Sequence, residues 1–169
     1  MSENGAVLRS VRHEVWADLE LLRFCERLAP EQLRWTVPGT YGAIHNTLQH
    51  IVRAQRGYLG RLTGDPGTDV VPADSERLLG IDDLIAKERV VGERIERLLG
   101  QDFDPTRVIT LKRGDVAQGT ATAGVILAQF IHHGSDHRAH IGTILGAHGV
   151  APPDLDVWSY GGSIGEVTG

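Results

Sequence analysis

Hydrophobic residues recur at intervals of three and four along four stretches of the chain, the spacing that places them on one face of an α-helix. The first amphipathic helix is expected over about residues 5–28, where Pro30 follows the stretch. The second has its apolar stripe over 44–62, and the third, with two acidic residues in its first turn, over 81–99. The fourth is expected over about 121–146. Four long helices predict an all-α fold, a four-helix bundle formed by a single domain over residues 1–169.

The pattern changes between residues 100 and 120. Val108 and Thr110 show the alternation that is typical of a strand, and residues 113–115 offer a turn. A short hairpin or an extended crossover is therefore expected between the third and fourth helices. The tail from residue 151 contains two prolines and a glycine pair, so it is expected to be irregular, but its apolar residues predict that it packs back onto the helices.

Composition narrows the classes of function. The chain has 17 basic and 22 acidic residues, which gives a net charge of −5. It therefore lacks the positive electrostatic field that attracts nucleic acids and anionic membranes. There is no run of 18 apolar residues, and the polar residues 1–5 do not resemble a signal peptide; we expect no membrane span and a cytoplasmic location. The lone Cys25 excludes an intramolecular disulfide and a cysteine-based zinc site. The 8 histidines are the unusual feature.

Three of these histidines share one face of the fourth helix. At 100° per residue, His133, His137 and His140 fall within about 60° of one another, on the side that also carries Phe130 and Ile144. That side is expected to turn toward the interior. Imidazole is a good ligand for zinc, nickel, copper and iron(II), and an i, i+4 pair can reach a single ion. A hydrogen-bond network that satisfies all three rings is the alternative.

A third ligand has to come from a facing helix, since helical bundles build metal sites in that way. The second helix offers His45 and His50. Spacing does not choose between them, and it makes His50 look exposed, because this residue lies about 130° from the centre of the apolar stripe of its helix.

Three motifs together resemble the DinB superfamily: Thr47-Leu48-Gln49-His50-Ile51, the run from His133 to Ile141, and Pro152-Pro153-Asp154-Leu155-Asp156. The resemblance covers nearly the whole chain. It implies a four-helix bundle with one long crossover, commonly dimeric, that holds a divalent metal through one histidine on the second helix and an HxxxH pair on the fourth. On this chain those positions are His50, His133 and His137. Zinc or nickel is the leading candidate, ahead of iron and manganese. Relatives often have Gly-Gln where this chain has Ala139-His140. His140 is therefore a candidate metal ligand, a supporting group beside the metal or a general base, with a polar packing role as the alternative.

Relatives of this superfamily include bacillithiol S-transferases and the mycothiol-dependent maleylpyruvate isomerase. The resemblance therefore implies a metal-dependent enzyme that activates a low-molecular-weight thiol, or water, for transfer to a small electrophilic substrate, and a homodimer. A metal-dependent hydrolase and a non-catalytic metal- or ligand-binding stress-response protein are the alternatives. Of the remaining polar residues, Arg138 is expected to form a salt bridge or a dimer contact, and Asp136 is a candidate for fixing a ligand imidazole. Cys25 is expected to be a small packed residue.

Overall fold

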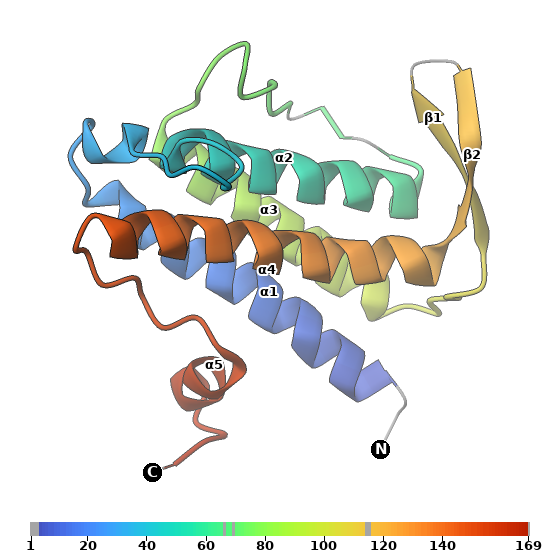
Figure 1. Cartoon of the computed structure of the whole chain (residues 1–169). Coiled ribbons are helices and arrows are strands. Elements are labelled where there is room, and N and C mark those ends of the chain that lie inside the picture. The colour runs from blue at the N-terminus through green and yellow to red at the C-terminus, as the bar shows by residue number, and fades with distance from the viewer. Residues whose placement is uncertain (1–3, 66, 69, 114–115, 169) are drawn as a thin grey trace.

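The computed structural model describes residues 4–65, 67–68, 70–113 and 116–168. Within these residues the protein is mostly helical, with one small two-stranded sheet (Figure 1). The elements are α1 (Asn4–Glu26), a short 3-10 turn η1 (Gln32–Arg34), α2 (Ile44–Thr63), α3 (Ile81–Leu99), β1 (Val108–Arg113), β2 (Val116–Thr122), α4 (Ala123–Ala147) and α5 (Val157–Ser163). None of the described helices combines the length and the apolar character that crossing a membrane requires.

The ends of the long helices follow from local chemistry. Gly64 ends α2 in the left-handed region at φ 73°, which glycine adopts without strain. The Thr122 side chain accepts a hydrogen bond from the Val125 amide and caps the start of α4. The fourth helix therefore begins at Ala123, two residues after its predicted start, because the residues before it complete β2. The first helix ends at Glu26, two residues before its predicted end.

The hairpin predicted between the third and fourth helices is present. β1 and β2 pair antiparallel, with Val108 opposite Thr122, and residues 114 and 115 of the predicted turn lie outside the described residues. Ile109 of β1 is buried in the apolar cluster that also holds Leu59 and Leu62 of α2. The hairpin therefore stands against one end of α2, as Figure 1 shows, and the fold is helical with a small sheet rather than purely α.

The prediction of an irregular tail is wrong for residues 157–163, which form α5. Asp156 caps this helix by accepting a hydrogen bond from the Ser159 amide. The expected packing onto the body is confirmed, because the buried Tyr160 ring lies 5.5 Å from the ring of Trp16 on α1. Trp158 of α5 is 73% exposed, so not every apolar residue of the tail packs onto the helices.

The interior has two apolar clusters with a polar layer between them. One cluster comes from the C-terminal halves of α1 and α4 and the N-terminal halves of α2 and α3, and the other comes from the opposite halves. Between them, every long helix contributes a buried polar side chain: Glu14 and Asp18, Gln55, Glu88 and Arg138. Ion pairs and hydrogen bonds within this layer therefore join α1, α2 and α4, in addition to the apolar packing.

Candidate metal centre

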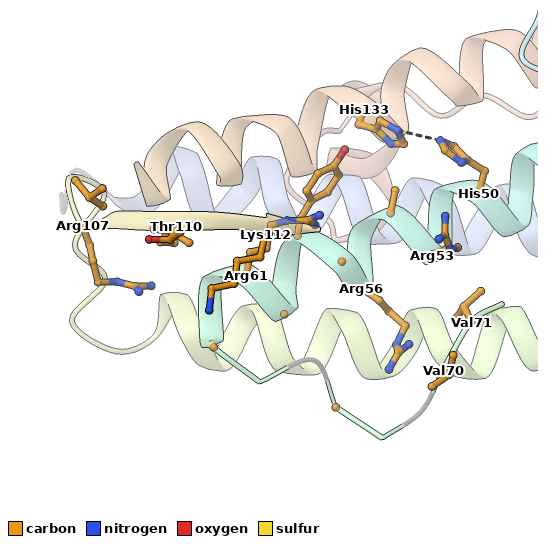
Figure 2. A pocket seen from close by; sticks show the side chains of 18 residues that line it. His50, Arg53, Arg56, Arg61, Val70, Val71, Arg107, Thr110, Lys112 and His133 are labelled. Carbon is orange, nitrogen blue, oxygen red and sulfur yellow. Dashed lines mark hydrogen bonds between the residues drawn. The ribbon is translucent and has the colours of Figure 1, made fainter. Parts of the chain in front are cut away.

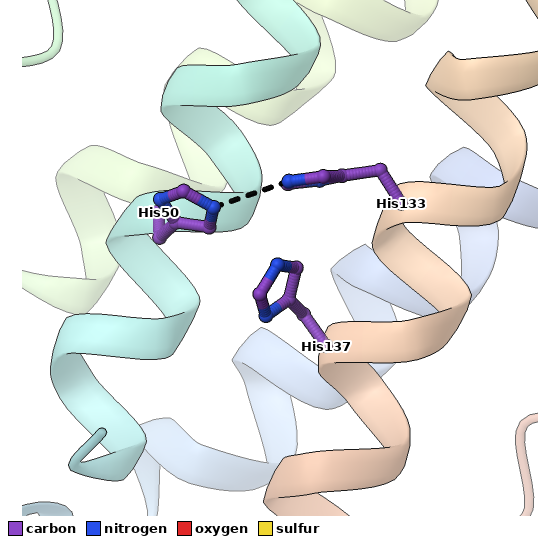
Figure 3. A group of neighbouring side chains, drawn as sticks. All are labelled: His50, His133 and His137. Atoms are coloured by element: carbon purple, nitrogen blue, oxygen red, sulfur yellow. Dashed lines mark hydrogen bonds between the residues drawn. The ribbon is translucent and has the colours of Figure 1, made fainter. Parts of the chain in front are cut away.

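Three histidine side chains from two helices meet where α2 faces α4. His133 and His137 lie one turn apart on α4, and His50 points toward them from α2 (Figure 3). One ring nitrogen from each histidine lies within 4.8 Å of those of the other two. The Nε2 atoms of His50 and His133 are 3.1 Å apart. The structure thus brings together the three residues that the family resemblance singled out.

His50 is half-buried, although helical spacing suggested that it would be exposed. The reason is that α2 is covered on more than one side. Gln49 accepts a hydrogen bond from the Leu79 amide and donates to the Arg77 carbonyl, which ties the loop before α3 to one flank of α2. The next residue, His50, lies on the flank that faces α4. The apolar stripe in the sequence marks only one buried face, so it does not show that a helix is packed on several sides.

The three imidazoles are neutral at neutral pH. Burial lowers the pKa of His50, with a further contribution from His137, and burial followed by the neighbouring His50 lowers the pKa of His133. Burial and the adjacent His133 lower the pKa of His137 to about 4. The neutral ring is the form of histidine that binds a metal ion, so the cluster needs to lose no proton to do so.

Several ring nitrogens in this region lack a hydrogen-bond partner. The Nδ1 atoms of His133, His137 and His140 are buried, and none has a partner among the described residues. Buried polar atoms are rarely left in this state because it costs free energy. The three converging imidazoles are neutral, and two of them, His133 and His137, have an unpartnered ring nitrogen. Such a donor set fits a divalent transition metal.

Comparison with known proteins places the chain in a family. The model of the DinB family matches residues 1–163. The chain belongs to the DinB family. The match includes α2 and α4 with all three histidines, whereas no curated protein matches the chain.

Two tyrosines, which the sequence analysis did not identify as site residues, contact the three histidines of this DinB protein. The Tyr41 hydroxyl lies 2.8 Å from Nδ1 of His50, and its ring stacks on the His50 ring at 4.2 Å and meets His137 edge-on at 4.8 Å. Tyr58 meets His133 edge-on at 5.6 Å. No spacing rule could identify Tyr41, because its contact depends on how the loop before α2 folds over that helix. Burial, then the nearby Asp74, raises the pKa of Tyr41, so its hydroxyl stays protonated.

His140 and Asp136, which lie next to the HxxxH pair in the sequence, do not belong to the group of three histidines. The His140 ring lies 5.6 Å from that of His137, beside the cluster and outside the group of three. Asp136 is exposed and makes no hydrogen bond to a histidine ring among the described residues, so it does not orient a ligand imidazole here.

Two other candidates from the sequence lie away from the site. His45 donates from Nε2 to the Leu79 carbonyl at 2.8 Å, so it helps to fasten the loop before α3. Cys25 is fully buried, and burial raises the pKa of its thiol to about 12. A protonated, inaccessible thiol is a packing group, as the sequence suggested, and not a nucleophile.

Arg138 forms a salt bridge, as expected, but in the interior. Its guanidinium donates to Glu14 at 2.7 and 2.9 Å and to Asp18 at 2.6 Å. Gln55 donates to both carboxyl groups. The carboxyl oxygens of Glu88, which is also buried, have no partner among the described residues. The sequence held one signal for this buried group. Glu14 and Asp18 lie four residues apart, on the face of α1 that also carries buried apolar residues.

Proposed function

We propose that this chain is a divalent-metal-dependent enzyme that activates a low-molecular-weight thiol, or water, for transfer to a small electrophilic substrate. The ligands in this proposal are His50, His133 and His137. The observation that carries it is the convergence of these neutral imidazoles on one point between α2 and α4. In this proposal α1 to α4 form a DinB-type four-helix bundle, whose facing helices supply the ligands.

The space beside the histidines favours a catalytic centre over a structural one. Structural zinc sites are closed by four protein ligands, whereas three ligands leave a position open. A cavity of about 1070 Å³ adjoins the cluster and is lined by His50 and His133. A bound divalent ion would supply Lewis acidity that lowers the pKa of a thiol or a water into the neutral range.

The surrounding residues have roles that follow from their contacts. Tyr41 holds the Nδ1 side of the His50 ring, so that Nε2 is directed toward His133. The stacked Tyr41 ring also restricts rotation of His50. We assign His140, whose Nδ1 is buried and unpartnered among the described residues, as the candidate proton acceptor next to His137.

Metal analysis tests the ligand assignment. We expect the purified protein to bind zinc or nickel, and His133→Ala or His137→Ala to weaken that binding by at least about 10- to 100-fold, the loss seen even when only a supporting residue is removed. His132→Ala is the matched control, because His132 is exposed on the same helix. Equal metal affinity in all three variants would reject the site.

Cobalt substitution then tests the chemistry. Titration of the cobalt form with a small neutral thiol, 1-thioglycerol, should produce a thiolate-to-cobalt absorption band that His133→Ala lacks. If thiols leave the spectrum unchanged but esters or amides are cleaved, the proposal of thiol transfer is wrong and a hydrolase is indicated. Metal binding with neither response would indicate the non-catalytic binding protein.

A further inference from the structure

The cavity beside the histidines extends well beyond them. It runs along α2 to the hairpin, where residues of β1 form a wall, and the loop that follows α2 contributes Val70 and Val71 (Figure 2). Figure 2 shows His50 and His133 in one region of this cavity and Arg107 at the far end. Its volume of about 1070 Å³ slightly exceeds the usual range of roughly 300–1,000 Å³ for small-molecule sites.

Basic side chains dominate the polar part of the lining. Arg53, Arg56 and Arg61 come from α2, and Arg107 and Lys112 come from the hairpin side. No acidic side chain lines the cavity among the residues that the structure describes. The positive charge is therefore concentrated in one hollow of a chain whose net charge is −5.

Most of these cations have no carboxylate partner. The described residues provide no ion pair for Arg53, Arg61 or Lys112. Arg61 lies over the Tyr58 ring at 5.9 Å, and Arg107 donates to the Leu62 carbonyl at 2.6 Å, but neither contact neutralises a charge.

Some arginines elsewhere on the surface are paired with carboxylates. Arg12 pairs with Glu96 at 3.1 Å, and Arg94 pairs with Asp65 at 3.0 Å. The cavity differs from these regions because its described lining contains five basic side chains and no carboxylate. A hollow lined by cations of one sign focuses the electrostatic field and attracts anions.

We propose that this cavity binds a small molecule carrying two or more carboxylate or phosphate groups, with its anionic part along Arg53, Arg61 and Lys112 and its reacting end at His50 and His133. The inference deepens the proposed function, on which it rests for the reacting end. Arginine offers paired donors that match both carboxylate and phosphate oxygens, and the exposed positions let the ligand enter. The substrate or thiol used here is therefore polyanionic.

Calorimetry with thiol-free probes tests the inference on the purified protein. Propane-1,2,3-tricarboxylate and inorganic pyrophosphate should bind, whereas glycerol should not, and the tighter of the two anions identifies carboxylate or phosphate as the natural group. Arg53→Gln, Arg61→Gln and Lys112→Gln should each weaken binding by about two- to five-fold, the effect of one exposed charge pair. Metal content measured after each titration ensures that the probes have not removed the ion.

Arg89→Gln is the matched control, since it removes one exposed charge from α3, outside the cavity. Equal weakening by Arg89→Gln, or equal heats for the anions and glycerol, would overturn the inference. The thiol titration with 1-thioglycerol is independent of these probes. Charge-dependent anion binding without a thiol band would leave the anion site intact and reject thiol transfer, and the reverse pattern would reject only the polyanionic ligand.

Discussion

Gly134 of α4 lies where the fold leaves no room for a side chain. A Cβ atom built there would lie 1.8 Å from Oε1 of Glu14 and 3.0 Å from Nη1 of Arg138. Glu14 is fully buried, and the same Oε1 accepts hydrogen bonds from Arg138 at 2.9 Å and from Gln55 at 3.2 Å. The absence of a side chain at Gly134 is therefore what allows the carboxyl group to reach its partners.

The cost of Gly134→Ala follows from that contact. Restoring a 3.0 Å separation would require Glu14 to retreat by about 1.2 Å, which is enough to break its hydrogen bonds to Arg138 and Gln55. Disrupting a buried ion pair costs about 3–5 kcal/mol, and the helix propensity of alanine returns about 0.5–1 kcal/mol. We expect a net loss of about 2–4 kcal/mol in the free energy of unfolding, or roughly 4–16 °C in melting temperature.

Urea denaturation followed by circular dichroism measures this loss, and Gly146→Ala is the matched control. Gly146 lies on the same helix, and no neighbouring atom comes within 4 Å of the position that a methyl group would take there, so the same chemical change should stabilise the protein by about 0.5–1 kcal/mol. The two variants should therefore shift the midpoint in opposite directions.

A double variant isolates the cause. In a Glu14→Ala background the clashing oxygen is absent, so Gly134→Ala should cost much less than it does in the parent chain. An undiminished cost in that background would refute the reasoning, because it would show that the penalty comes from something other than Glu14.

Three further outcomes are expected. Burial raises the pKa of Glu88 well above its ordinary value of 4.5, so the free energy of unfolding should fall as the pH rises from that ordinary value through the raised pKa. Glu88→Gln should flatten this fall in urea titrations over the same pH range. Tyr41→Phe removes the hydrogen bond to His50 and should lower zinc affinity by about 10-fold or more in competition titrations, whereas Tyr58→Phe should leave it nearly unchanged. Cys25 should react with a thiol reagent only at the rate of unfolding, which labelling at increasing urea concentrations measures.

Much of the fold could be predicted because the spacing of apolar residues along the chain indicates where amphipathic helices lie. The third helix runs over 81–99, as the periodicity indicated. The errors lie where local signals compete. The glycines of 157–163 suggested an irregular tail, but Asp156 caps a short helix there, and α5 packs on α1. The hairpin strand β2 runs directly into α4, so the boundary between them could not be read from apolar spacing.

The pairing of His133 with His137 was determined by sequence alone, because residues four apart on any α-helix lie on the same face. The place of His50 beside them was decided only by the tertiary structure, since it depends on which flank of α2 faces α4. The same holds for Tyr41, the charged interior around Arg138 and the basic cavity between α2 and β1. Periodicity reports one buried face of one helix, whereas these features exist only where side chains from separate elements meet.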